Sequence, residues 1–356
     1  MISSYIVVFT LLSTTKLLIT TAFQSQQQQH HHQLHQQYPH PHYSTTRSSS
    51  MALSSSTPTF QSGVTTETKK KESVCIIGGG NAAHALAALL PFQGYEKTTM
   101  YCPYKDEAKR INDGLAEQDG FMIADFASHN TPSGIIRDKP MLVSKDPQEV
   151  IPDADVLIMP LPSFVYPSTL QDIKPYLHDK QILIVSPGQG GFDWFASEIL
   201  GAELMSKIVI IGLMPMPFNV RIETFGKHVA VQEMKKKYSI GVLPRTAYGD
   251  SKRLIEDMFC ASVQPAGKGT FLEVTMFPIN AVIHPARLYT LLSSWSEGDV
   301  IDTNPLFYED YNAEAAQCLN ELNSELITIG KKLSEHGVPV DIPHIVSCFL
   351  FNFIYR

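Results

Sequence analysis

The stretch Ser73-Val-Cys-Ile-Ile-Gly-Gly-Gly-Asn-Ala-Ala-His-Ala-Leu-Ala-Ala-Leu-Leu90 decides the fold of this chain. Its first part, Val74 to Ile77, is a short apolar run ahead of glycines, which predicts a buried parallel strand. Its last part, Asn81 to Leu90, is rich in alanine and leucine and predicts a helix. A strand, a glycine-rich turn and a helix in this order predict the start of an α/β domain.

The glycine-rich turn has the spacing of a dinucleotide-binding site. Gly78, Gly80 and Ala83 fit the pattern G-x-G-x-x-(G/A). The first glycine permits the tight turn, the second lets the backbone approach a pyrophosphate, and the alanine lets the helix pack closely on the strand. The free N–H groups at the helix start then hold the phosphates. The alternative is a glycine turn in another kind of α/β protein.

Composition narrows the class of protein. The chain has 356 residues, which suggests about two domains, and a formal net charge of −7. This acidic balance argues against nucleic acid as the main partner. The five cysteines are scattered and form no C-x-x-C pair. Neither a zinc site nor a disulfide framework is therefore indicated, and reduced thiols are the simplest interpretation.

Residues 1–70 are predicted to be a leader outside the folded domain. Tyr5 to Ala22 contains an apolar run that is too short and interrupted to predict a membrane span, and it resembles a signal-peptide core. The junction at Ala22-Phe23 looks like the bipartite plastid-targeting presequence of algae with secondary plastids. The tract behind it has no acidic residue until Glu67. We expect targeting to a plastid or another organelle. The alternative is a cytoplasmic protein whose disordered leader carries no targeting signal. No stable membrane partner is expected for the folded part.

The second strand, Thr98 to Tyr101, leaves the choice of cofactor open. In an NAD enzyme an Asp or Glu usually closes this strand and accepts hydrogen bonds from the ribose hydroxyls. Here Cys102-Pro103 follows instead, and the charged residues come later. Basic residues among them could serve the 2′-phosphate of NADP, although the solvated first turn of a helix explains the charges equally well. The nearby charged residues are Lys105, Asp106, Glu107, Lys109 and Arg110.

Further apolar runs extend the predicted sheet. Strands are expected within Asp155 to Pro162, Gln181 to Val185 and Lys207 to Met214. The second of these leads into another glycine-rich turn, and we expect both turns to face the nicotinamide half of the cofactor, because ligands bind outside the carboxyl ends of parallel strands. His228 to Gln232 and Ser239 to Leu243 are expected to form a hairpin or edge pair. The residues expected to contact the cofactor are Gly78, Gly79, Gly80, Asn81, Ala82, Ala83 and Pro160.

Near residue 269 the pattern changes from strands to helices. Phe271 to Trp295 is long and apolar, and Tyr308 to His336 carries apolar residues at intervals of three and four. Gly337 followed by Val338-Pro339 is a helix stop. We therefore expect an α/β nucleotide-binding domain over residues 71–268 and an α-helical domain over 269–356. The closing segment, Ile345 to Arg356, is apolar, so we expect it to be buried against another part of the protein.

Four stretches resemble the opine dehydrogenases, the octopine and nopaline dehydrogenase-like family. They are Val74–Ala83, Ala154–Leu177, Ser186–Phe192 and Asn280–Tyr289, and the similarity covers about residues 72 to 345. The resemblance implies an α/β fold, with a Rossmann dinucleotide-binding domain followed by an α-helical domain. It also implies a reductive condensation of an amino acid with an α-keto acid. The expected cofactor is NADH or NADPH, and the family favours NADH.

The resemblance places the family's catalytic histidine on His284. A group that titrates near neutral pH can give and take a proton in both directions of the reaction, and histidine does so without a large shift. The alternative is a hydrogen-bonded core histidine. Substrates with two carboxylates also need cations, and arginine binds carboxylates in a bidentate manner. Arg221 and Arg287 are therefore candidate substrate-binding residues, with ordinary ion pairs as the alternative.

One family motif, R-Y-x-x-E-D, is missing and would be expected beyond residue 356. In the family its aspartate pairs with the histidine and its arginine holds substrate carboxylate. We hypothesise that the sequence is a truncated or mis-spliced gene product of impaired activity. A second interpretation is a nucleotide-binding protein without catalysis. A third is an enzyme like glycerol-3-phosphate dehydrogenase or ketopantoate reductase, which uses a lysine that Phe271 to Trp295 lacks.

Overall fold

The computed structural model describes residues 71–342, except 189, 268, 278, 301, 302, 304, 308 and 309. By its contacts the chain divides into Met1–Glu67 and Thr68–Arg356, and the description below concerns the second unit. The predicted leader and the apolar segment after residue 344 lie outside the described residues. The boundary near residue 268 stays a prediction. Across the described ranges, no helix is both long and apolar enough to cross a membrane.

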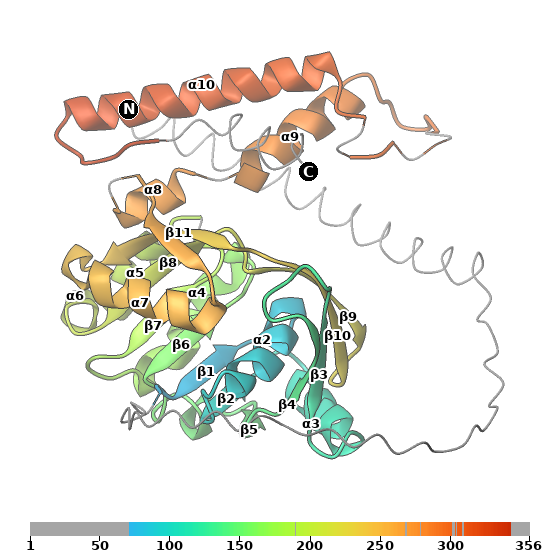
Figure 1. Ribbon diagram of the computed structural model, residues 1–356. Helices are drawn as coiled ribbons and strands as arrows, with labels where there is room; N and C mark the ends of the chain where they lie inside the picture. The colour runs from blue at the N-terminus through green and yellow to red at the C-terminus, as the bar shows by residue number, and fades with distance from the viewer. Residues whose placement is uncertain are drawn as a thin grey trace, which may run out of the picture. The chain divides into compact units, whose positions relative to one another are not determined.

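An eight-stranded sheet forms the centre of the nucleotide-binding part (Figure 1). Its strands are β1 (Val74–Ile77), β2 (Thr98–Tyr101), β5 (Leu142–Ser144), β6 (Val156–Met159), β7 (Ile182–Val185), β8 (Val209–Met214), β11 (Lys237–Leu243) and β12 (Ser262–Pro265). The order is β12-β11-β8-β7-β6-β1-β2-β5. The run from β5 to β8 is parallel and has the strand order of the dinucleotide-binding fold. The sequence predicted β1 and β2 to the residue.

Helices cover both faces of this sheet. Val74 and Ile76 share a core with α2 (Asn81–Phe92) and α7 (Tyr248–Phe259). Cys75 and Ile77 share the opposite core with α4 (Tyr166–Ile173) and α5 (Phe192–Leu200). Successive side chains of a strand point to opposite faces. A strand buried on both faces therefore consists of apolar residues throughout, as β1 does.

A second sheet lies on the other side of α2 (Figure 1). Its four strands have the order β4-β3-β10-β9. Helix α2 thus lies between two sheets, and its residues from Ala82 to Pro91 are all buried. This explains why α2 is apolar on every side rather than along one stripe. The strands are β3 (Met122–Phe126), β4 (Gly134–Asp138), β9 (Phe218–Thr224) and β10 (His228–Met234).

The predicted pairing of His228–Gln232 with Ser239–Leu243 is wrong. These segments belong to β10 and β11, which lie in different sheets. Strand β10 forms a hairpin with β9 through a turn at Gly226, whose φ is +76°, and it pairs in parallel with β3. Strand β11 pairs with β8 and β12. The hairpin of β9 and β10 satisfies the backbone of β10 with a nearer neighbour in sequence, so β11 is free to extend the large sheet.

The helical part contains α8 (Phe271–Thr275), α9 (Ile279–Leu292) and α10 (Ala313–Glu335). The predicted start of the last helix at Tyr308 is wrong. The helix begins at Ala313, because Asn312 caps it by accepting a hydrogen bond from the Ala315 N–H at 2.9 Å. Helices α9 and α10 pack together through a small apolar core that contains Val282, Ile283, Ala286 and Leu319.

Helix α8 joins the helical part to the large sheet. It packs closely against three glycines, Gly188, Gly212 and Gly241, because a side chain at these positions would collide with it. A Cβ on Gly241, for example, would lie 2.6 Å from the Thr270 carbonyl oxygen. Equivalent atoms on the other two would lie 2.8 Å from α8 side chains. The buried Glu273 carboxylate accepts hydrogen bonds from the Thr270 N–H at 2.9 Å and the Asp341 N–H at 2.7 Å. It thereby ties α8 to the segment after α10. Helices α3 (Glu107–Ala116) and α6 (Ala202–Met205) complete the described helices.

Candidate active site

The glycine turn after β1 leaves open space at the start of α2. Gly78 has a φ of +102°, which favours glycine, and a Cβ there would lie 2.6 Å from the side chain of Leu161. At Gly80 no atom lies within 4 Å of the position of a Cβ. Gly80 is also the N-cap of α2 and provides no side-chain cap. The first N–H groups of α2 therefore point into a space that suits a pyrophosphate.

The other residues expected at the cofactor take different positions. Asn81 is exposed, and its side-chain oxygen accepts a hydrogen bond from the Ile222 N–H at 2.7 Å. Ala82 and Ala83 are buried, so they contribute their backbone and their small size rather than a side chain facing the cofactor. Gly79 is covered by Glu107, whose carboxylate accepts a hydrogen bond from the Gly79 N–H at 3.1 Å.

The loops after three neighbouring strands meet at the carboxyl edge of the sheet. Leu161, which follows Pro160 at the end of β6, touches the turn at Gly78. Ser163 of the same loop lies 3.0 Å from the position of a Cβ on Gly190, in the turn after β7. The structure therefore brings the two glycine-rich turns and Pro160 to one edge. In open α/β sheets this edge binds the ligand.

His84 is a buried residue that the sequence reasoning did not single out. The Gly226 N–H donates a hydrogen bond to its Nε2 at 2.9 Å, so the proton is on Nδ1, which lies 3.1 Å from the Gly80 carbonyl oxygen. Burial lowers the pKa of His84 to about 4 and keeps the ring neutral. His84 thus connects the dinucleotide turn to the β9–β10 hairpin. Its signal in the sequence is a lone polar residue within an otherwise apolar helix.

His284, the predicted catalytic residue, lies on α9 and is half-buried. Its ring packs edge-on against Phe307, with 4.8 Å between the ring centroids. Burial lowers the pKa of His284 below its ordinary value. Within the described residues nothing forms a hydrogen bond with its ring. A neutral imidazole with free nitrogens can exchange a proton with a bound substrate.

The two predicted arginines lie in different surroundings. Arg287 follows His284 by three residues, so both side chains project from the same side of α9. It is 4% exposed, and its Nε has no hydrogen-bond partner within the described part of the chain. Arg221 is exposed on β9, where its guanidinium donates to the Val220 carbonyl oxygen at 2.8 Å. No hydrogen bond or ion pair between described residues joins Arg221 to His284 or Arg287.

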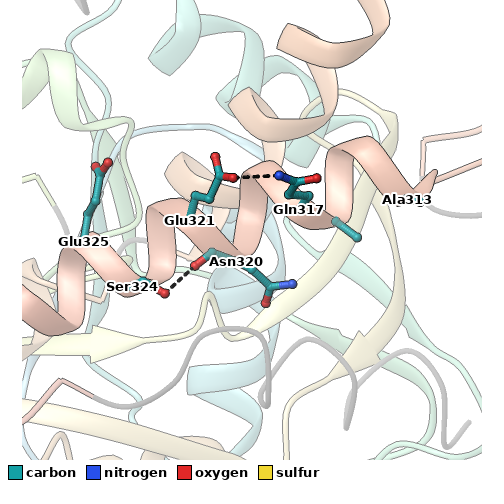
Figure 2. Close-up of a pocket in the computed structure, with 7 residues that line it drawn as sticks. Ala313, Gln317, Asn320, Glu321, Ser324 and Glu325 are labelled. Carbon is teal, nitrogen blue, oxygen red and sulfur yellow. Dashed lines mark hydrogen bonds between the residues drawn. The ribbon is translucent and has the colours of Figure 1, made fainter.

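A separate surface hollow lies along α10 (Figure 2). Most of its lining residues have polar side chains, and two of these are joined by a hydrogen bond, which Gln317 donates to Glu321 at 2.9 Å. Neither the glycine turns nor His284 contributes to it, so it is not the cofactor site. The lining residues are Ala313, Ala316, Gln317, Asn320, Glu321, Ser324 and Glu325.

Comparison with known proteins adds relatives at low identity. No protein-family model matches the chain. It is 29% identical to tauropine dehydrogenase from Arabella iricolor over 76% of this chain and 68% of the relative. It is 28% identical to opine dehydrogenase from Haliotis discus hannai, over 77% of this chain and 68% of the relative. A solved structure of octopine dehydrogenase with NADH and L-arginine superposes with a TM-score of 0.70 at 22% identity, covering 80% of this chain and 70% of that one.

The strand order, the open glycine turn and the helical part that follows define a Rossmann dinucleotide-binding fold, and together with the dehydrogenases among the relatives they indicate an NAD(P)-dependent oxidoreductase. This confirms the fold class predicted from the sequence. The chain is similar to the opine dehydrogenases, the family that its motifs resemble.

Proposed function

We propose that this chain catalyses the reversible reductive condensation of an amino acid with an α-keto acid. The observation that carries the proposal is the pair on α9: a half-buried histidine of lowered pKa, three residues from a buried arginine whose Nε lacks a partner among the described residues. Relatives support the substrate class, since they include tauropine, opine and octopine dehydrogenases. Solved structures of octopine dehydrogenase contain NADH with L-arginine or with pyruvate.

The cofactor site would be formed by the turn after β1. The N–H groups of α2 bind the pyrophosphate, and Gly80 leaves room for it to approach. The loop at Pro160 and Leu161 and the turn at Gly190 border the neighbouring edge of the sheet. When bound, NADH or NADPH supplies the hydride that reduces the substrate.

His284 would exchange the proton. The amine nitrogen of the amino acid attacks the keto carbon, the C–O bond breaks with loss of water, and the resulting imine carbon accepts the hydride. In this direction protonated His284 donates a proton to the imine nitrogen as the hydride reaches the carbon, which gives the secondary amine. In the reverse direction neutral His284 accepts the proton that the secondary amine loses as hydride leaves. Its lowered pKa favours the neutral ring at pH 7 and therefore favours the reverse step.

Arg287 would bind a substrate carboxylate. A buried guanidinium without an anion is costly, because burial disfavours an unpaired charge. Its place on the His284 side of α9 lets one carboxylate satisfy Arg287 while the reacting atoms lie near the ring. Arg221 is an exposed alternative for the second carboxylate, and within the described residues no hydrogen bond or ion pair joins it to α9.

Oxidation of NADH by the full-length chain tests this proposal. We expect turnover with pyruvate and one member of an amino-acid panel, and a secondary amine product in the mass spectrum. Turnover should stop when either substrate is omitted. Cofactor binding without turnover would contradict the proposal and favour the nucleotide-binding alternative. Reduction of pyruvate in the absence of an amino acid would indicate an ordinary 2-hydroxy acid dehydrogenase.

We also propose that residues 1–70 direct the chain to a plastid or another organelle. The support is the sequence: an apolar run, an Ala-Phe junction and a tract free of acidic residues until Glu67. A fusion of these residues to a fluorescent protein in an alga with secondary plastids should label the organelle. Diffuse fluorescence would contradict the proposal and favour a cytoplasmic protein.

A further inference from the structure

Glu107 places a fixed carboxylate on the dinucleotide turn. Its Oε2 accepts a hydrogen bond from the Gly79 N–H at 3.1 Å, and a Cβ on Gly79 would lie 2.7 Å from its carboxyl carbon. The side chain is half-buried. Its second oxygen, Oε1, makes no hydrogen bond within the described residues. One oxygen is therefore held by the protein, and the other is available to a ligand.

This carboxylate lies on the adenosine side of the turn. In the sheet β1 stands between β6 and β2, and the order reverses between β1 and β6. A dinucleotide crosses the sheet edge at this reversal, with one nucleotide over each half. Glu107 begins α3, which follows β2, and so belongs to the β2 half. The nicotinamide half lies over β6 and β7, where the loop at Pro160 and the second glycine turn meet.

The basic residues near Glu107 have other contacts. Lys109 pairs with Asp113 at 2.6 Å. The ammonium of Lys105 lies 5.1 Å from the centre of the Tyr104 ring, and the guanidinium of Arg110 lies 4.0 Å from the centre of the Phe225 ring. All three side chains are exposed, whereas Glu107 is held against the turn. Burial raises the pKa of Glu107, and the hydrogen bond from Gly79 and the nearby charge of Arg110 oppose this shift. Among these charged side chains, Glu107 is the one that a hydrogen bond fixes on the turn.

We propose that Glu107 determines cofactor specificity: its carboxylate binds the 2′-hydroxyl of the adenosine ribose and repels a 2′-phosphate, so that the chain uses NADH in preference to NADPH. This inference rests on the proposed function in that a nicotinamide dinucleotide must bind. In this fold an Asp or Glu at the end of the second strand normally forms hydrogen bonds with the hydroxyls of this ribose. Here Cys102-Pro103 occupies that place, and the helix after the strand supplies the acid instead.

Binding of NADH and NADPH to the full-length chain tests the inference without any need for turnover. The readout is the change in nicotinamide fluorescence on titration, for the wild type and Glu107→Gln. Glutamine retains an oxygen for the Gly79 N–H but removes the charge. We expect the wild type to bind NADH more tightly, and Glu107→Gln to shift the ratio of the two dissociation constants toward NADPH by roughly 10- to 100-fold.

Asp106→Asn is the matched control, because it removes the same charge from the neighbouring residue, whose side chain does not cap α3. It should leave the ratio within about twofold of the wild type. Equal affinity of the wild type for both cofactors, an unchanged ratio in Glu107→Gln, or an equal shift in Asp106→Asn would each overturn the inference. Preferential NADH binding without turnover would overturn the proposed function and leave this inference intact.

Discussion

Helices α2 and α9 each carry a histidine whose pKa is lowered by burial, but the two histidines differ in their partners. His84 of α2 is fully buried, and both of its ring nitrogens contact backbone groups. His284 of α9 is half-buried, and its ring has no hydrogen bond within the described residues. A histidine with two backbone partners stabilises a structure. A histidine without them is available to a substrate.

The largest expected effect is the loss of catalysis when His284 of α9 is replaced. His284→Ala should lower kcat/KM by roughly 100- to 10,000-fold, the usual contribution of a general acid–base, because the proton would then have to come from water. Cofactor affinity and the melting temperature should stay close to the wild type. Steady-state kinetics and NADH titration check this. As a control, Tyr289→Ala removes an exposed residue further along α9 and should retain activity.

The next effect is on the stability of α2. His84→Ala should lower the free energy of unfolding by about 2–4 kcal/mol, because it leaves a cavity and an unsatisfied Gly226 N–H. Urea denaturation measures the change. His129→Ala removes an exposed histidine and should cost less than about 0.5 kcal/mol. A His84→Ala protein as stable as this control would show that the ring does not hold the hairpin.

Acid should weaken the same contact. The pKa of His84 is lowered from 6.5 to about 4 in the folded chain. Between these values the unfolded chain binds the proton first, so this stabilisation is complete above pH 6.5 and is lost as the pH falls toward 4. The loss attributable to His84 approaches about 3 kcal/mol. Urea denaturation across this range should show a steeper decline in the wild type than in His84→Ala, and parallel declines would contradict the assignment.

The smallest effect is expected at Thr270, the N-cap of α8, the helix that joins the helical part to the large sheet. Thr270→Ala removes the N-cap hydroxyl of α8 and should cost about 1 kcal/mol of stability. Because α8 joins α9 to the sheet, we expect a rise in KM for the amino acid with unchanged NADH affinity. Thr270→Ser retains the hydroxyl and should restore both values. A loss of NADH affinity in Thr270→Ala would instead couple this cap to the cofactor turn.

The sequence predicted the central strands and the glycine turn because their signals are local. Val74–Ile77 is an apolar run ended by glycine, and a strand buried on both faces requires such a run. The second sheet was not predicted as a unit, because β3 pairs with β10 from a distant part of the chain. A local sequence pattern can predict a strand but not the strand it pairs with, so β10 was assigned to the wrong neighbour.

The sequence predicted the parts of the site that depend on the backbone of the turn. It did not predict the contacts that a side chain makes with a residue far away in the sequence. Gly78 and Gly80 follow from the turn alone. Glu107 was noticed, but it comes too late in the sequence for the usual rule. It reaches Gly79 because the chain turns at Lys105, whose φ is +47°. The partner of His84 was not predictable either, because Gly226 arrives from the β9–β10 hairpin.

The burial of α2 between two sheets also bears on how the chain folds as it is synthesised. The helix leaves the ribosome early, and β3 and β4 of the sheet on its second side follow it closely, but the β9–β10 hairpin that completes this sheet begins only at Phe218. Until Met234 has emerged, this apolar side of α2 is only partly covered. Pairing over such a separation closes a long loop and is slow. Translation therefore leaves part of the dinucleotide-binding helix accessible to chaperones until the second sheet is complete.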